Sequence, residues 1–104
     1  MIFHVTDETE FEAILNSNEF VIVDFWATWC GPCRMLGSVI EEYSAENSEI
    51  AIIKVDVDAA RDLAASYDVQ SLPTVVIFKN GQEQASKVGF LSKSAFTQFV
   101  EENK

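Results

Sequence analysis

Hydrophobic residues recur along this chain with two different spacings, one typical of strands and the other typical of helices. Residues 20–26 are apolar at every position except Asp24, which predicts a central strand covered on both faces. Beyond Cys33 the apolar residues return every three or four positions, which is the spacing of one buried helix face. That predicted buried face consists of Met35, Leu36, Val39, Ile40 and Tyr43.

Shorter patterns predict the remaining elements. Further strands are expected at residues 2–5, 50–57, 73–78 and 84–88. The Asn80-Gly81 pair between the last two strands is a strong hairpin signal. Further helices are expected to begin with an N-cap at Thr6 or Asp7, at Asp58 and at Ser92, because these side chains can accept a hydrogen bond from the first helical turn.

The order of these elements is β-α-β-α-β-α-β-β-α. Strands that alternate with helices favour parallel neighbours joined by right-handed crossovers, and the late hairpin adds antiparallel pairing. The predicted fold class is α/β, with a central mixed five-stranded sheet flanked by four helices. At 104 residues the chain is expected to form a single domain, residues 1–104.

The only two cysteines, Cys30 and Cys33, follow the predicted strand 20–26 at the point where a helix should begin. A helix N-terminus carries partial positive charge and unpaired N–H groups, and both stabilise a thiolate. Pro32 suits the first helical turn, and Gly31 leaves the approach to Cys30 free of side chain. We therefore predict a reversible dithiol, with Cys30 as the attacking nucleophile and Cys33 as the resolving thiol. The alternative is half of a zinc site, which needs two further ligands from a chain with one histidine.

Asp24 is the one ionisable residue in the most apolar stretch. An unpaired carboxylate is costly in such a place, so burial should raise its pKa and leave it able to accept a proton from Cys33. Lys54, on the strand expected alongside, is the natural counter-charge. The alternative is an aspartate that points to solvent at a strand irregularity.

Charge and composition narrow the possible partners. The chain has 17 acidic and 7 basic residues, a net charge of −10, which disfavours nucleic acid and anionic membranes as partners. No apolar run approaches the roughly 20 residues of a membrane helix, and the N-terminus lacks the features of an export signal. Two cysteines in a C-x-x-C pair suit a reducing compartment, so we expect a cytoplasmic monomer.

Several segments together resemble the thioredoxin family. They are Trp29-Cys30-Gly31-Pro32-Cys33, Val23-Asp24-Phe25-Trp26-Ala27, Lys54-Val55-Asp56-Val57-Asp58, Leu72-Pro73-Thr74, Phe78-Lys79-Asn80-Gly81 and Lys87-Val88-Gly89. The resemblance covers essentially the whole chain. It implies the thioredoxin fold, protein-disulfide reductase activity, and no bound cofactor or metal besides a redox-active Cys30–Cys33 disulfide. It also implies re-reduction by an NADPH-dependent thioredoxin reductase, and clients such as ribonucleotide reductase, methionine sulfoxide reductase and peroxiredoxins.

The resemblance further implies a docking surface around the cysteines. Sequence alone favours a trans Leu72-Pro73 bond, whereas the matching proline of thioredoxins is cis and lies against the dithiol. An apolar rim for client proteins is expected from Trp29, Gly31, Pro32, Leu72, Pro73, Val88, Gly89 and Phe90. Asp58 is a candidate acceptor for the Trp29 indole N–H. The chain departs from the common family pattern at Arg34, at Ser38 where proline is usual, and at Phe90 where a small residue is usual.

Three other functions compete with the reductase interpretation. The same chemistry could run in reverse, as an oxidant or isomerase, although the Gly-Pro between the cysteines speaks against it. The fold could serve as a binding module with an idle redox step. A glutathione-fed, glutaredoxin-like role fits the W-C-G-P-C sequence less well.

Overall fold

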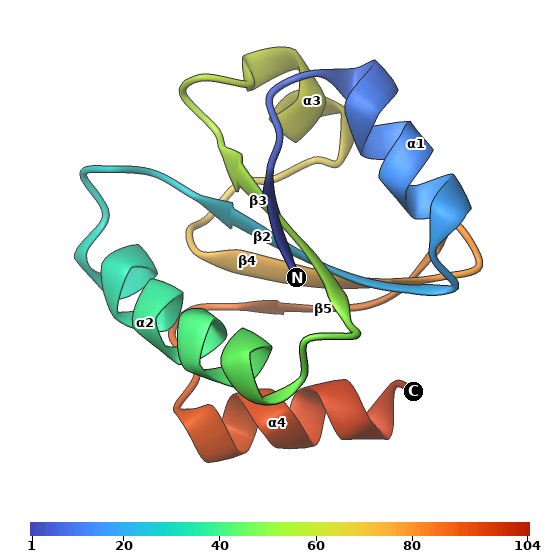
Figure 1. Ribbon diagram of the computed structural model, residues 1–104. Coiled ribbons are helices and arrows are strands. Elements are labelled where there is room, and N and C mark those ends of the chain that lie inside the picture. Colours follow the sequence, from blue (N-terminus) through green and yellow to red (C-terminus); the bar gives the residue numbers. More distant parts are fainter.

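A five-stranded mixed sheet forms the centre of the computed structural model, which describes residues 1–104 (Figure 1). The strands are β1 (Ile2–His4), β2 (Phe20–Trp26), β3 (Ala51–Asp56), β4 (Thr74–Lys79) and β5 (Gln82–Val88). The helices are α1 (Glu8–Ser17), α2 (Gly31–Glu46), α3 (Arg61–Ser66) and α4 (Lys93–Glu102). The strand order is β1-β3-β2-β4-β5, with β1, β3 and β2 parallel and β4 and β5 antiparallel to their neighbours. The predicted element order and the mixed sheet are both confirmed.

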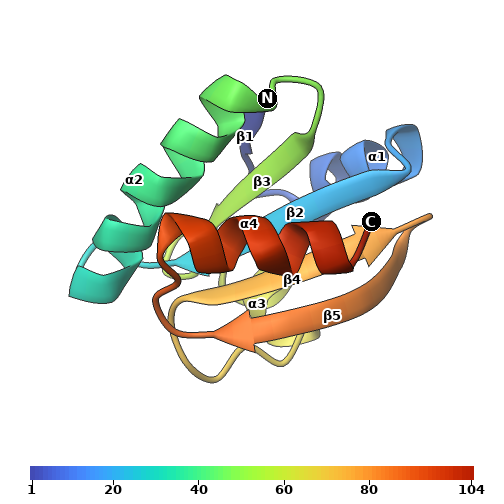
Figure 2. The same cartoon turned by 90° about the horizontal axis from the view of Figure 1, so that it is seen from below.

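The helices cover both faces of the sheet, with α1 and α3 on one side and α2 and α4 on the other (Figures 1 and 2). Strand β2 lies between β3 and β4 and is buried along nearly its whole length. Val23 packs with the first pair of helices, whereas Ile22 packs with the second. Side chains alternate along a strand, so Asp24 lies on the same face as Ile22, the face that α2 covers.

Helix α2 is built on the predicted apolar stripe, with one exception. Leu36, Ile40 and Tyr43 are fully buried at positions i, i+4 and i+7. Met35 was expected to join them, and that prediction is wrong because its side chain is 58% exposed. Leu36 follows Met35 by one residue, about 100° around the helix, so only one of them can face the sheet.

The β4–β5 hairpin confirms the turn prediction. Asn80 and Gly81 both adopt positive φ angles, 54° and 79°, which a two-residue type I′ hairpin turn requires. Strand β5 starts at Gln82, two residues before the predicted start, because the tight turn lets pairing begin at once.

The helix starts agree with the expected N-caps at two of three places. The Asp7 side chain accepts from the backbone N–H of Thr9, and the Ser92 hydroxyl accepts from that of Ala95. The prediction that Asp58 caps the third helix is wrong, since α3 begins after Ala60 and has no side-chain cap.

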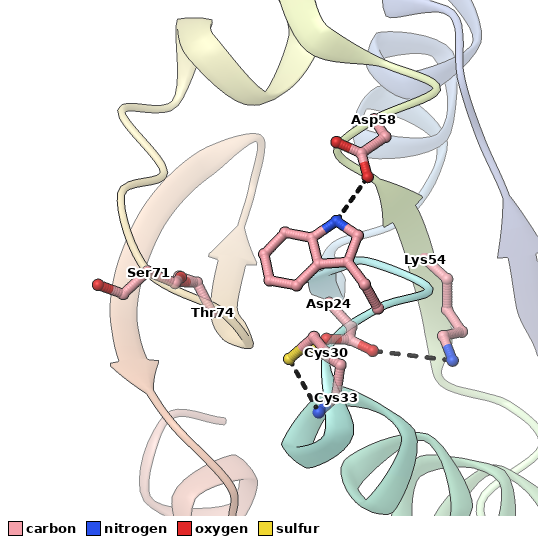
Figure 3. Close-up of a disulfide and its surroundings, with 8 residues drawn as sticks. Asp24, Cys30, Cys33, Lys54, Asp58, Ser71 and Thr74 are labelled. Atoms are coloured by element: carbon pink, nitrogen blue, oxygen red, sulfur yellow. Dashed lines mark hydrogen bonds and ion pairs between the residues drawn. A yellow bond between two sulfur atoms is a disulfide. The ribbon is translucent and has the colours of Figure 1, made fainter.

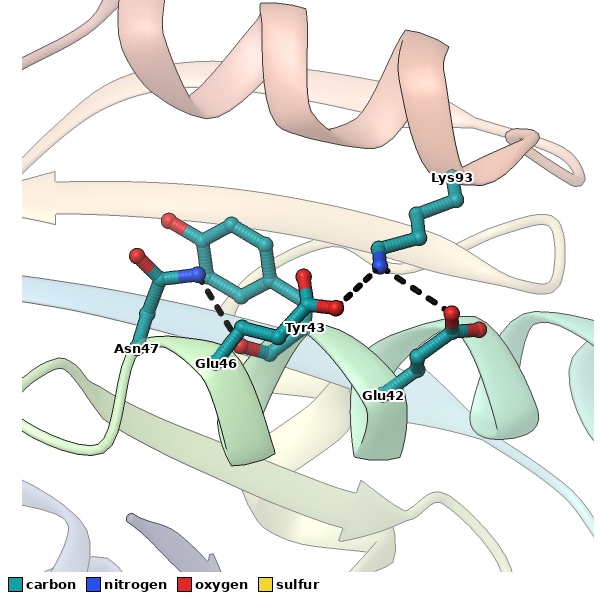
Figure 4. Close-up of polar contacts among 5 residues, drawn as sticks. All are labelled: Glu42, Tyr43, Glu46, Asn47 and Lys93. Carbon is teal, nitrogen blue, oxygen red and sulfur yellow. Dashed lines mark hydrogen bonds and ion pairs between the residues drawn. The ribbon is translucent and has the colours of Figure 1, made fainter.

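An ion-pair cluster joins α4 to α2 (Figure 4). Lys93 Nζ lies 3.0 Å from Glu42 Oε1 and 2.7 Å from Glu46 Oε2. Hydrogen bonds to both glutamates raise the pKa of Lys93, with Glu46 contributing more. Beneath this cluster Tyr43 packs edge to face against Phe96, with ring centroids 5.2 Å apart. The contacts fix α4 against α2 and so support the helix that carries the cysteines. None of the four helices is long and apolar enough to cross a membrane.

Candidate active site at the start of helix α2

The two cysteines meet at the first turn of α2, directly beyond the end of β2. Cys30 is the N-cap residue and Cys33 is the third residue of the helix. The two are joined as a disulfide, with their Cα atoms 5.2 Å apart. The backbone N–H of Cys33 donates to Cys30 Sγ at 3.2 Å, as Figure 3 shows. The Cys30 sulfur therefore occupies the place where an N-cap side chain normally accepts a hydrogen bond from the helix.

The two cysteines differ in access to solvent. Cys30 is 7% exposed and Cys33 is 1% exposed. Behind them Ala27 is fully buried, and Trp26, Val57 and Leu72 pack against the same small cluster. Cys30 is thus the more accessible of the two cysteines.

The loop before β4 lies against this cluster through Leu72. The Leu72–Pro73 peptide bond is cis, as the family resemblance implied and contrary to the expectation from sequence alone. The Pro73 carbonyl accepts a hydrogen bond from the Gly89 N–H at 2.8 Å. Gly89 has φ +100°, a conformation that glycine adopts without strain. This hydrogen bond ties the end of β5 to the proline loop.

The predicted rim contains most of the large apolar side chains that the molecule exposes. Trp29 is 70% exposed, Val88 63% and Phe90 42%. Gly31 and Pro32 are exposed in the first turn of α2. The Trp29 indole N–H donates to Asp58 Oδ2 at 2.8 Å, so Asp58 holds the indole instead of capping a helix. Met35, which the sequence analysis assigned to the core, is a further exposed apolar residue on α2.

Asp24 is fully buried, and neither of its carboxylate oxygens has a hydrogen-bond partner. Burial raises its pKa from 3.8 to about 7, and the positive charge of Lys54 partly opposes that rise. Lys54 lies opposite Asp24 in the pairing of β2 with β3, and its Nζ is 3.8 Å from Asp24 Oδ2. In Figure 3 the Asp24 carboxylate is drawn between the cysteine pair and the Lys54 ammonium. The structure therefore pairs Asp24 with Lys54 and Cys30 with Cys33, as the sequence predicts for the ion pair and the dithiol.

Two neighbours of the Lys54 ammonium were not predicted. Its Nζ lies 5.1 Å from the centre of the Trp26 ring, which is a cation–π contact. A Cβ on Gly37 would come within 3.3 Å of the same atom, so the glycine leaves room for it. The contact with Trp26 could have been predicted from the sequence. Trp26 follows Asp24 by two residues, so both side chains lie on the same face of the strand, where Lys54 is expected as the partner of Asp24. No group of three His, Cys, Asp or Glu side chains in the molecule could hold a metal ion.

Comparison with known proteins decides the family. The thioredoxin family model matches residues 2–102. The chain belongs to the thioredoxin family. A thioredoxin from Rickettsia bellii is 39% identical over 104 residues, 99% of each chain. A thioredoxin from Mycoplasma pneumoniae is 40% identical over 100 residues, 96% of this chain and 98% of that one.

Solved thioredoxin structures share the fold. A structure of Plasmodium falciparum thioredoxin has a TM-score of 0.89 at 38% identity, covering 97% of this chain and 98% of that one. A mutant thioredoxin from Halobacterium salinarum has a TM-score of 0.90 at 36% identity, covering 98% of this chain and 89% of that one. The thioredoxin fold and the family resemblance are confirmed.

Family membership and the cysteine pair together establish the activity. Thioredoxins are thiol-disulfide oxidoreductases, and this member carries its redox-active disulfide in its own chain. It is a dithiol protein-disulfide reductase, and members of the family work with a thioredoxin reductase and disulfide-containing clients.

Proposed function

We propose that each residue of the site has a distinct role in reducing client disulfides. In the reduced protein, the Cys30 thiolate attacks one sulfur of the client disulfide. A bond forms between Cys30 Sγ and that sulfur, and the other client sulfur leaves as a thiolate. The position of Cys30 at the helix N-cap and its greater exposure support its assignment as nucleophile.

Cys33 then resolves the mixed disulfide. Its thiol gives a proton to the Asp24 carboxylate, and the resulting thiolate attacks Cys30 Sγ. The bond between Cys30 Sγ and the client sulfur breaks, and that sulfur leaves as a thiolate. The proton held by Asp24 and one proton from solvent convert the two client thiolates to thiols, and the protein is left with the Cys30–Cys33 disulfide. The pKa of Asp24, raised to about 7, suits a group that must accept and return a proton near neutral pH. Lys54 serves as the partner that keeps part of the Asp24 population ionised.

The exposed apolar rim binds the client around the scissile disulfide. An extended client segment pairs with the backbone next to the cis Pro73, in the manner of an added strand. Trp29, Gly31, Pro32, Leu72, Val88, Gly89 and Phe90 contact the client side chains. The proposed client-binding rim is supported by the large apolar side chains of Trp29, Val88 and Phe90, which are all exposed.

The 104 residues work as one domain, and the protein is a cytoplasmic monomer. An NADPH-dependent thioredoxin reductase reduces its Cys30–Cys33 disulfide with two electrons. A bifunctional thioredoxin reductase/thioredoxin from Mycobacterium leprae is 44% identical over 92 residues, which make up 20% of that protein. This fused relative supports the reductase as partner. The clients proposed are ribonucleotide reductase, methionine sulfoxide reductase and peroxiredoxins. A net charge of −10 disfavours nucleic acid and anionic membrane as partners.

The single observation that carries this proposal is the unequal placement of the two cysteines: Cys30 is the N-cap residue and is 7% exposed, whereas Cys33 lies inside the helix and is 1% exposed. The test is insulin reduction, followed once with NADPH and a thioredoxin reductase and once with dithiothreitol as the electron source. The second arm separates the chemistry of the site from its match to one reductase. The native protein should accelerate both reactions.

Three cysteine variants (two single and one double) and one control make the test specific. Cys30→Ser should abolish turnover, and Cys33→Ser should accumulate a stable mixed disulfide with the client. Ser38→Ala, on the exposed side of α2, should keep the native rate. Mixed disulfides formed through Cys33 in place of Cys30 would reverse the assigned roles, and full activity of the double serine variant would refute the proposal.

A further inference from the structure

A polar groove runs away from the proline loop on the sheet face that α2 does not cover. Its volume is about 590 Å³, within the range of roughly 300–1,000 Å³ typical of ligand sites. Thr74 and Val76 of β4 and Ser86 and Val88 of β5 line one side, and residues 66–71 line the other. Strand β5 is an edge strand, and its lining residues Glu83, Ser86 and Val88 are exposed. Of the eleven lining residues only four are hydrophobic, so the groove does not suit an apolar ligand.

Two carboxylates that line the groove take part in no ion pair. Asp68 and Glu83 both line it and both are exposed. The ion pairs of the molecule use other carboxylates, so neither of these two is paired with a lysine or arginine. Asp68 Oδ1 accepts only the uncharged Gln70 amide, at 3.2 Å. Burial raises the pKa of the neighbouring Tyr67 phenol, and the charges of Glu12, Glu8 and Glu83 raise it further.

One end of the groove coincides with the client-binding rim. Val88 lines the groove and is also one of the exposed rim residues. It pairs with Thr74, the residue directly after the cis Pro73. A client segment bound at the proline loop can therefore continue into the groove without leaving the surface of the molecule.

We infer that this groove is a client subsite that selects disulfide-containing polypeptides with a lysine or arginine a few residues from the target cysteine. The inference rests on the proposed function and narrows its substrate class. The basic side chain would lie between the Asp68 and Glu83 carboxylates, while the exposed Ser71 and Ser86 hydroxyls bind the client backbone. The complementarity of charge and the continuity with the rim both favour a basic peptide as the occupant.

The strand register gives the spacing. Val88 lies opposite Thr74 and Glu83 lies opposite Phe78, four residues further along β4. At about 3.4 Å per residue this separation is about 14 Å. An extended client that spans the same distance would place its basic residue about four positions beyond the client residue that lies at Val88.

The experiment measures kcat/KM for reduction of synthetic peptides with one disulfide and otherwise neutral side chains. A single lysine is moved through each position on either side of the target cysteine, with glutamine in the same place as the reference. We expect one narrow window of positions in which lysine raises kcat/KM about fivefold at low ionic strength, since exposed charge pairs contribute modestly. The gain should shrink toward unity in 1 M salt, where the Debye length is about 3 Å.

Two double variants that each remove two negative charges distinguish the effect of the groove carboxylates from the effect of the protein's net charge. Asp68→Asn/Glu83→Gln should remove the lysine preference, and asparagine tolerates the positive φ of 55° at position 68. Glu41→Gln/Glu102→Gln changes the net charge equally on the α2 and α4 side, and it should retain the preference. The inference is refuted if both double variants lose the lysine preference equally. It is also refuted if the native protein shows no lysine preference at any position. If the glutamine peptides are still reduced, the proposed function stands; if no peptide is reduced, the proposed function itself fails.

Discussion

Replacing Asp24 by asparagine removes the only fully buried ionisable carboxyl of the molecule and should change how stability depends on pH. Burial raises its pKa from 3.8 to about 7. Between these two values the unfolded chain releases a proton that the folded protein keeps, so the native protein loses stability as pH rises. The loss begins near pH 4 and is complete slightly above pH 7.

The rise in pKa sets the size of the effect. At about 1.36 kcal/mol per pH unit, a rise from 3.8 to about 7 corresponds to about 4 kcal/mol. This is a large part of the roughly 5–15 kcal/mol that stabilises a typical domain. An asparagine at this position cannot ionise, so the free energy of unfolding of Asp24→Asn should not show this decrease as pH rises. Relative to the native protein, its free energy of unfolding should increase by about 4 kcal/mol between pH 4 and pH 8.5.

Urea unfolding of the oxidised proteins at several pH values, followed by tryptophan fluorescence, measures this difference. The change of the difference with pH is the informative quantity, because it is independent of how well the asparagine amide packs. Asp62→Asn makes the same chemical change at an exposed position of α3 and should leave the stability within about 0.5 kcal/mol at every pH. A difference between Asp24→Asn and the native protein that stays constant from pH 4 to pH 8.5 would refute the reasoning.

Two further predictions concern the partner of Asp24 and the backbone near the proline loop. Lys54→Met should raise the pKa of Asp24 above about 7, since the lysine charge lowers it; carboxyl-labelled NMR titration checks this, and an unchanged or lower pKa contradicts it. Gly89→Ala should destabilise the protein by about 1–2 kcal/mol, because φ is +100° there. Gly31→Ala is the control for this change, since neither glycine has an atom within 4 Å of an added Cβ and only Gly89 has a positive φ. Equal thermal stability of the two alanine variants would contradict the strain argument.

The features that could be predicted from the sequence are those that a few neighbouring residues determine. The run around Asp24 indicated a strand buried on both faces, and that strand is β2. The position of Cys30 and Cys33 after this strand placed them at the start of α2, where the structure has them. Asn80-Gly81 determined the hairpin because the pair accepts two successive positive φ angles.

The features that were predicted wrongly or missed depend on contacts between residues distant in the sequence. Met35 fits an apolar stripe as well as Leu36 does, and only the orientation of α2 on the sheet exposes one of them. Asp58 suits an N-cap, but the Trp29 indole reaches it from a loop 29 residues away. The groove beside β5 depends on how residues 66–71 lie relative to β4 and β5, which no local pattern encodes.

The most direct test of the account is the rate at which iodoacetamide alkylates each cysteine of the reduced protein as a function of pH. A helix N-terminus stabilises a charge by about 0.3–1 kcal/mol and by up to ~2, which lowers a thiol pKa by at most about 1.5 units. Cys30 should therefore react with a midpoint clearly below the roughly 8.5 of a free thiol, and Cys33 should remain unmodified under the same conditions. Equal alkylation of Cys30 and Cys33 with a midpoint near that of a free thiol would contradict the assignment of Cys30 as the nucleophile.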